Sequence, residues 1–172
     1  HDSGEIISCE VFIAVLPYSG LIFCKAFRSQ QTADFVSCIN DMLRFYGGVP
    51  ATILCDNLKT AVTAPSRYEP VFTEVCELLS AHYSTTFSAT RPYSPRDKAM
   101  VEKSVNIVYN HIYGPLRNLV YASLADLNKA IDDKLQLLND KTYKKTPYSR
   151  QYYFTTQEAH LLREQPSAPF ML

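Results

Sequence analysis

The first apolar stretches of the chain predict a β-hairpin. Residues 5–16 and 21–27 are rich in β-branched and aromatic side chains, and the Pro17-Tyr18-Ser19-Gly20 segment between them is typical of a tight turn. A strand edge without a neighbour is a template for pairing with another segment. We therefore expect a further strand before residue 1, with the open edge otherwise covered by another copy of the chain or by the C-terminal segment.

The rest of the chain alternates between helix and strand patterns. Apolar residues recur at helical spacing in four segments, and we expect helices over residues 31–46, 70–82, 95–113 and 123–138. Short β-rich runs predict strands over residues 51–55 and 85–89. This order indicates an α/β domain with an antiparallel hairpin at its front and helical crossovers after it.

Capping residues and apolar stripes make the helix predictions specific. Ser94 and Ser123 are each followed three residues later by an Asp, as in a capping box, and Gly114-Pro115 is expected to end the third helix. The predicted buried positions are Phe35, Ile39, Met42, Leu43 and Tyr46; Val71, Val75, Leu78 and Leu79; Val101, Val105, Val108 and Ile112; and Leu127, Ile131, Leu135 and Leu138.

Composition excludes several classes of protein. With 172 residues, 47% hydrophobic and 20% charged, the chain can bury a core of ordinary domain size. No apolar run approaches the roughly 18 residues of a membrane span. Five scattered cysteines without CxxC spacing argue against a zinc ribbon or a disulfide scaffold, and favour a reducing compartment. Phosphate-binding GxxxxGK[ST] and GxGxxG motifs are absent from the sequence.

Charge is unevenly distributed although the net charge is zero. Residues 1–90 carry five basic and nine acidic side chains, whereas residues 91–150 carry eleven basic and six acidic ones. The basic excess in residues 91–150 is compatible with a polyanionic partner, or equally with a solvated helical face.

Two carboxylates are the main candidates for chemistry. Asp56 directly follows a short apolar strand, where side chains reach the ligand-binding crevice of α/β sheets, although an Asx turn before Asn57 would explain it equally well. Glu102 borders the buried stripe of the third helix, and taken alone it resembles a surface residue paired with Lys98. Together they are oxygen donors of the kind that Mg²⁺ requires.

Other polar and aromatic residues are weaker candidates. His82, His111 and His160 lack metal-ligand spacing and are interpreted as structural or surface residues, and Cys55 as a core residue. The aromatic residues near Lys144, Lys145 and Arg150 could contact nucleic acid or simply pack the C-terminal segment; they are Tyr148, Tyr152 and Tyr153.

Three motifs together resemble the integrase core of IstA-type insertion-sequence transposases. They are Phe45-Tyr46-Gly47-Gly48-Val49-Pro50, the run from Cys55-Asp56-Asn57 to Val62, and Arg91-Pro92 with the run from Pro95 to Glu102. Ser123-Leu124-Ala125-Asp126-Leu127-Asn128 and the proline-containing tail fit the same family.

This resemblance implies an RNase H-like mixed sheet with flanking helices, here lacking its first strand. It further implies a DDE triad that binds two Mg²⁺ or Mn²⁺ ions and transfers DNA strands, with Asp56 as the second acid and Glu102 as the third. The first acid is expected upstream of His1, since Asp2 reads as part of a connecting turn, and this segment alone is expected to be inactive. Phosphate contacts are expected from Lys59, Arg91, Arg96, Lys98 and Lys103.

The resemblance also suggests an organisation and partners. Residues 1–139 would form the core and residues 140–172 a basic, tyrosine-rich arm or linker. DNA, further copies of the chain and an AAA+ helper ATPase would be the partners, with no membrane, in the bacterial cytoplasm. A catalytically dead module for DNA binding or oligomerisation, and a nuclease of the same fold, are the alternatives.

Overall fold

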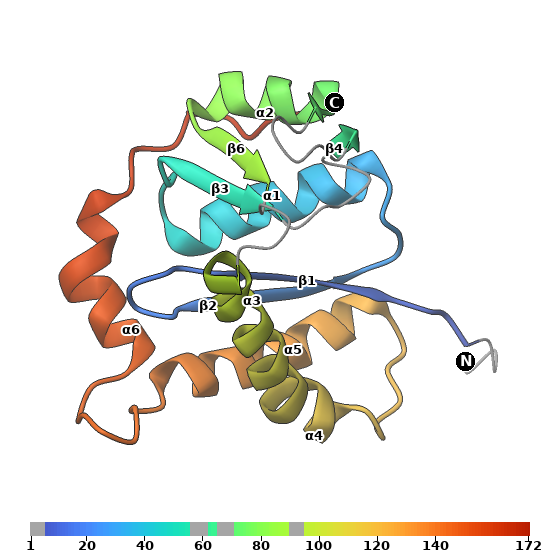
Figure 1. The fold of residues 1–172 in the computed structure, drawn as a ribbon. Helices are drawn as coiled ribbons and strands as arrows, with labels where there is room; N and C mark the ends of the chain where they lie inside the picture. Colours follow the sequence, from blue (N-terminus) through green and yellow to red (C-terminus); the bar gives the residue numbers. More distant parts are fainter. Residues whose placement is uncertain (1–5, 56–61, 65–70, 90–94) are drawn as a thin grey trace. The chain divides into compact units, whose positions relative to one another are not determined.

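The structure is a computed structural model that describes residues 6–55, 62–64, 71–89 and 95–172 (Figure 1). Of residues 62–64, 71–72, 89 and 95–98, only the backbone is described. The chain divides into two compact units, residues 1–29 with 101–157 and residues 30–100 with 158–172. Both parallel and antiparallel strand pairs occur, so the fold is mixed α/β, as predicted.

The first unit begins with the predicted hairpin. Strands β1 (Glu10–Val15) and β2 (Ile22–Phe27) pair antiparallel, with Val15 opposite Ile22. The turn is closed by hydrogen bonds from Leu16 N to Leu21 O and from Gly20 N to Leu16 O, both 3.0 Å. Gly20 has φ 69°, and a methyl group there would lie 2.5 Å from Tyr143 Oη. Glycine is therefore required at this turn for two independent reasons.

Helices complete the first unit. The elements are α3 (Pro95–Val108), whose residues from Val101 onward belong here, the π-helix η1 (Tyr109–Tyr113), α4 (Gly114–Leu116), α5 (Leu124–Asp140), α6 (Arg150–Tyr153) and η2 (Phe154–Glu158). The predicted cap of α5 is confirmed, because Ser123 Oγ accepts a hydrogen bond of 3.1 Å from Asp126 N. The apolar core cluster joins β2 to these helices; its members are Ile22, Cys24, Ala26, Val108, Ile112, Leu116, Ile131, Leu135 and Leu138.

The prediction that Gly114-Pro115 ends the third helix is wrong. Gly114 has right-handed helical dihedrals, and its N–H donates to the carbonyl of Tyr109 across the wide π-turn. Pro115 then falls in the first turn of α4, where a missing N–H does no harm. The helical course therefore continues through the Gly-Pro pair to Leu116.

Two asparagines from α5 cover the outer edge of β2. Asn139 accepts from Ile22 N at 3.2 Å and donates to Ile22 O at 2.8 Å. Asn128 likewise accepts from Ala26 N at 2.8 Å and donates to Ala26 O at 2.9 Å. Each side-chain amide thus supplies the donor and the acceptor that a neighbouring strand would supply. The outer edge of β2 is therefore covered by α5.

The outer edge of β1 is different. Because Ile22 and Ala26 direct their backbone groups away from β1, the alternation of an antiparallel ladder directs those of Val11, Ile13 and Val15 away from β2. Within the described residues these outward N–H and C=O groups have no hydrogen-bond partner. One edge of the hairpin is therefore open to backbone pairing.

The second unit contains a parallel pair of strands and two helices. Strands β3 (Thr52–Cys55) and β6 (Thr86–Ala89) pair in parallel, with Cys55 opposite Ala89. Helices α1 (Thr32–Tyr46) and α2 (Glu74–Tyr83) belong to the same unit. All five residues predicted for the core stripe of the first helix are buried.

A short hairpin in this unit was not predicted. Strands β4 (Val62–Ala64) and β5 (Val71–Phe72) pair antiparallel, so Val71 lies in a strand and α2 starts at Glu74 after the extended residue Thr73. Strands of three and two residues are too short to show an alternating pattern.

Two predicted core positions are also wrong, because Leu78 is 47% exposed and Val105 45% exposed. The α2 positions beside Leu78 that are buried are Val75, Cys76, Leu79 and Tyr83.

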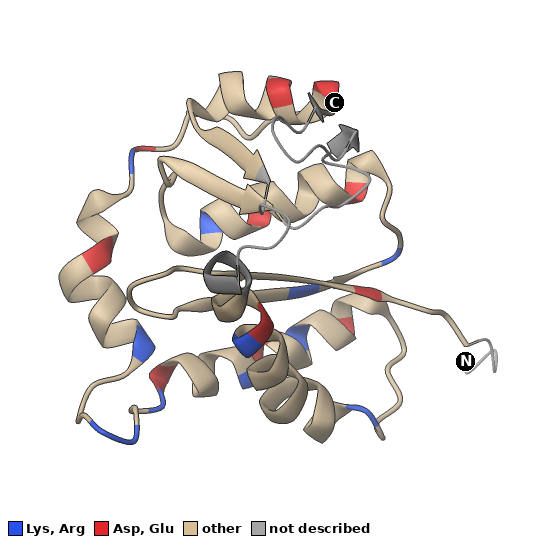
Figure 2. Ribbon diagram, viewed as in Figure 1, with Lys and Arg blue, Asp and Glu red and all other residues tan. Residues whose placement is uncertain are grey.

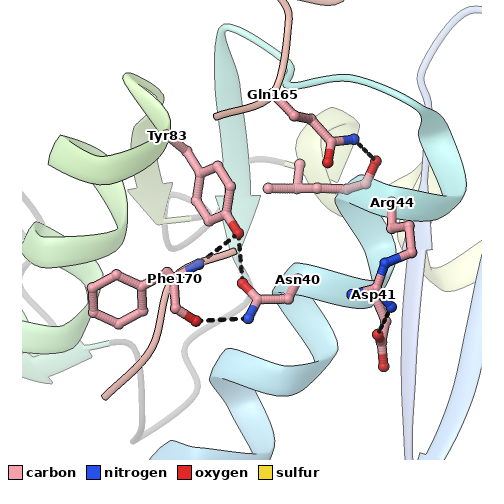
Figure 3. Close-up of polar contacts among 7 residues, drawn as sticks. Asn40, Asp41, Arg44, Tyr83, Gln165 and Phe170 are labelled. Atoms are coloured by element: carbon pink, nitrogen blue, oxygen red, sulfur yellow. Dashed lines mark hydrogen bonds and ion pairs between the residues drawn. The ribbon is translucent and has the colours of Figure 1, made fainter. Parts of the chain in front are cut away.

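The C-terminal segment is fastened to the second unit by polar contacts (Figure 3). After η3 (Ala159–Leu161), Arg163 forms a β-bridge with Val49. Gln165 Nε2 donates to Leu43 O at 2.6 Å, and Asn40 Nδ2 donates to Phe170 O at 2.9 Å. The Tyr83 hydroxyl links the two ends of this contact, since it donates to Asn40 Oδ1 and accepts from Phe170 N.

Across the described part of the chain, no helix combines the length and the apolar character that a membrane span needs.

Candidate active site

The carboxyl end of β3 leads directly to the first candidate acid. Because β3 and β6 run parallel, both strands end at the same edge of the pair, with Cys55 opposite Ala89. Asp56 follows Cys55 in sequence and lies outside the described residues, as do Lys59 and Arg91. Residues that follow parallel strands in this position face ligand-binding crevices in α/β proteins.

Cys55 itself is a core residue, as predicted. Its side chain is 8% exposed, and burial, with a smaller contribution from nearby Cys76, raises its thiol pKa to about 12. The thiol is therefore protonated at neutral pH and is unsuited to act as a nucleophile or a metal ligand.

The second candidate acid stands on the outside of α3. Glu102 and Lys103 are exposed, whereas Ser104 and Val108 further along the helix are buried. The buried face of the helix holds it in place, and the carboxylate of Glu102 points away from that face. Arg96 and Lys98 lie on the first turn and a half of α3, but their side chains are outside the described residues.

The described donors fit a divalent metal only in part. Glu102 has no hydrogen-bond or ion-pair partner among the described side chains, which do not include that of Lys98. No group of three or more His, Cys, Asp or Glu side chains within the described ranges is arranged to hold a metal ion. Glu102 alone does not make a metal site, and Asp56 lies outside the described residues.

The histidines take the places expected of structural or surface residues. His82 Nε2 lies 2.9 Å from Ala168 O, and its ring meets Phe170 edge to face. His111 and His160 are exposed.

Tyrosines form two exposed stacked pairs in the first unit. Tyr148 and Tyr152 stack with ring centroids 4.2 Å apart, and Tyr109 and Tyr113 with centroids 5.1 Å apart. Tyr148 and Tyr152 were both candidates from the sequence, whereas Tyr109 and Tyr113 were not. A spacing of four residues within a predicted helix is the signal that could have found Tyr109 and Tyr113, whereas Tyr148 precedes α6.

Comparison with known proteins places the chain in a family. It is 40% identical over 168 residues to a Sinorhizobium fredii protein named as a transposase (y4bL/y4kJ/y4tB), covering 98% of this chain and 33% of the relative. It is 36% identical over 165 residues to a Burkholderia multivorans protein named as a transposase for insertion sequence IS408, covering 96% and 32%. The transposase for insertion sequence element IS21 of Pseudomonas aeruginosa is 28% identical over 173 residues, covering 94% and 43%.

The chain is a homologue of the IS21/IstA-type insertion-sequence transposases. It spans about a third of the length of the first two relatives. No family model matches the sequence.

Solved structures show that this transposase homologue has the fold of integrase catalytic cores. The catalytic core domain of BIV integrase superposes with a TM-score of 0.67 at 16% identity, covering 88% of this chain and 89% of that one. The HTLV-2 integrase catalytic core domain in complex with magnesium gives a TM-score of 0.55 at 16% identity, covering 83% and 90%. At this identity the likeness establishes the RNase H-like fold alone.

Proposed function

We propose that this chain is the catalytic core of an insertion-sequence transposase that joins transposon 3′ ends to target DNA. The observation that carries the proposal is homology to transposases along nearly the whole chain. The exposed carboxylate of Glu102 on α3 and the position of Asp56 at the end of a parallel strand are compatible with it.

In this proposal Asp56 and Glu102 hold divalent metal ions. Two bound Mg²⁺ ions would activate an attacking 3′-hydroxyl and stabilise the leaving oxygen of the phosphodiester. The chain's own contribution would be the carboxylate oxygens of Asp56 and Glu102. Lys59, Arg91, Arg96, Lys98 and Lys103 would position the DNA through its phosphates.

The first acid of the triad would come from a strand that precedes the hairpin in the full-length protein. The open edge of β1, with its outward backbone groups at Val11, Ile13 and Val15, supports this part of the proposal. Residues 1–139 would then be the core and residues 140–172 an arm that follows it. Without this first acid the segment would bind metal poorly and would not transfer strands.

The test is strand joining by the full-length protein with labelled transposon ends and a target plasmid. Asp56→Asn and Glu102→Gln are each expected to lower joining by at least ~10³-fold while leaving DNA affinity and thermal unfolding unchanged. Glu77→Gln, an exposed glutamate on α2, is the matched control and should join normally. Normal joining by either candidate variant would refute the site assignment.

The products of the same assay separate the alternative functions. Free nicked strands without joined product would indicate a nuclease of this fold. DNA binding without cleavage or joining by the wild-type protein would indicate a catalytically dead binding or oligomerisation module. Assembly into oligomers, cooperation with an AAA+ helper ATPase and a bacterial cytoplasmic location remain predictions from the family resemblance.

A further inference from the structure

The loop between α5 and α6 presents a compact basic and aromatic surface in the first unit. We define the Lys/Tyr surface as Lys141, Lys144, Lys145, Tyr148 and Tyr152. All five side chains are exposed, and Tyr148 and Tyr152 retain 41% and 43% of their accessible area. Figure 2 shows basic residues, in blue, along this loop.

Backbone and side-chain hydrogen bonds build this loop into a defined shape. Thr142 and Ser149 form an antiparallel bridge, and Tyr143 N donates to Tyr148 O at 2.9 Å. Inside the loop, Tyr148 N donates to Thr146 Oγ1 at 3.3 Å. The segment from Tyr143 to Tyr148 is therefore a closed turn that carries Lys144 and Lys145, and not a free tail.

The same loop is anchored to the hairpin. Tyr143 Oη donates to Ser19 O at 2.7 Å, and the Arg150 guanidinium lies 4.8 Å from the centre of the Tyr143 ring. The ring of Tyr153 meets Tyr18 edge to face. Tyr143, Arg150 and Tyr153 are thus used for packing, and Tyr153 also meets the Tyr148 and Tyr152 rings edge to face. The three lysines and the exposed parts of the Tyr148–Tyr152 pair are left for another role.

The stacked pair is also held in place. Ser149 Oγ caps α6 by accepting from Tyr152 N at 3.1 Å, and the two rings lie nearly parallel, at 10°. Lys141, Lys144 and Lys145 have no acidic partner among the described residues. Exposed aromatic rings and lysines in one short segment are the combination that binds unpaired nucleotides, with bases on the rings and phosphates on the ammonium groups.

We propose that the Lys/Tyr surface binds a single-stranded or locally unpaired stretch of DNA through residues other than the candidate acids. The choice of DNA rests on the proposed function. Lys144 and Lys145 contact phosphates, Lys141 adds to the local positive potential, and an unpaired base stacks on the Tyr148–Tyr152 pair. Such a surface holds a DNA strand without reading its sequence.

The test measures fluorescence anisotropy of the full-length protein with labelled oligothymidine of about 20 nucleotides and with a duplex of equal length. Lys144→Ala/Lys145→Ala is compared with Arg117→Ala/Lys129→Ala, a control that removes two exposed charges elsewhere in the same unit. Loss of two phosphate contacts predicts a smaller salt dependence for the first variant. For the duplex, the ratio of the wild-type affinity to the affinity of the lysine variant should fall roughly tenfold between about 50 and 200 mM salt.

A second variant tests the aromatic part. Tyr148→Leu/Tyr152→Leu is expected to weaken binding to oligothymidine by roughly tenfold or more, with a smaller loss for the duplex. Tyr109→Leu/Tyr113→Leu, the other stacked pair, is the matched control. Thermal unfolding shows whether the tyrosine variant has lost its fold. If it has, the comparison of the lysine variant with its own control still tests the Lys/Tyr surface.

The outcomes separate this inference from the proposed function. Equal DNA affinities and salt dependences for the lysine variant and its control would overturn the Lys/Tyr surface, whatever joining activity remains. An equal loss on single strand and duplex in the tyrosine variant would overturn the unpaired strand as occupant. Normal joining by Glu102→Gln would overturn the catalytic proposal and leave the DNA-binding surface standing.

Discussion

The two edges of the β1–β2 hairpin are completed in different ways. Along β2, the side chains of Asn128 and Asn139 on α5 each bond the N–H and the C=O of one strand residue. Helix α5 therefore occupies the position where another strand could pair. Along β1, the outward groups of Val11, Ile13 and Val15 have no such cover among the described residues. The chain closes one edge with its own side chains and leaves the other for backbone pairing.

This difference shows which side of the hairpin can accept a further strand. A strand added at β2 would have to displace two paired amides, one of them on the buried residue Asn139. A strand added at β1 would meet backbone groups that have no hydrogen-bond partner among the described residues and that are already aligned for a ladder. The predictions below test this asymmetry, first at the backbone and then at the side chains.

Proline substitutions should show the largest difference in stability between the two edges of β1. Ala14→Pro removes an N–H that faces β2 and is expected to destabilise the protein by about 3 kcal/mol. Val11→Pro removes an outward N–H and should cost about 1 kcal/mol or less, since edge strands tolerate proline there. Urea unfolding measures both values. In a longer form with a preceding strand, Val11→Pro should become as costly as Ala14→Pro; if it stays harmless, no strand pairs there.

Asn139→Leu should open the β2 edge at its buried end. The change leaves the N–H and C=O of Ile22 without partners inside the core, and we expect a loss of about 2–3 kcal/mol in the free energy of unfolding. Asn110→Leu, on an exposed turn of η1, is the control and should change stability by less than about 0.5 kcal/mol. A loss at Asn139 no larger than the control would show that the amide does not stabilise the edge.

Asn128→Leu should open the other end of the same edge at a smaller cost. Asn128 is half-buried, so water can reach the freed backbone groups of Ala26, and the expected loss is about 1 kcal/mol. The double variant with Asn139→Leu then measures whether the two amides act independently. Additive losses indicate two separate clamps, whereas a double loss well above the sum indicates that the edge opens as one piece.

The helices and longer strands of this fold could be predicted because the spacing of apolar residues along them indicates which face is buried. The α1 stripe from Phe35 to Tyr46 and the Ser123 cap of α5 are examples. The β4–β5 hairpin could not, because its strands are shorter than a pattern can show. The course of the helix past Gly114 depends on a π-turn that no local propensity encodes.

The candidate site could be predicted only as far as its sequence motifs reach. Glu102 was found as a helical carboxylate beside a buried stripe, and the structure places it on the exposed side of α3. The roles of Asn128 and Asn139 were not predictable, because an asparagine that pairs with a distant strand looks like any polar helix residue in sequence. Long-range hydrogen bonds of this kind depend on the packing of α5, which follows from the whole core.

Cysteine labelling probes the same asymmetry with the smallest perturbation. Burial, followed by the nearby charge of Asp132, raises the thiol pKa of Cys24 on β2 from 9.0 to about 12. Stability that depends on the protonated thiol is complete below pH 9 and is lost between pH 9 and 12, so labelling at pH 8 leaves the fold intact. Only the thiolate reacts, and we expect iodoacetamide to modify half-buried Cys9 at least ~100-fold faster than Cys24, as read by mass spectrometry. Asn139→Leu should accelerate labelling of Cys24 and leave Cys9 unchanged, because it loosens only the β2 edge; equal acceleration at both cysteines would instead show that the whole hairpin unfolds together.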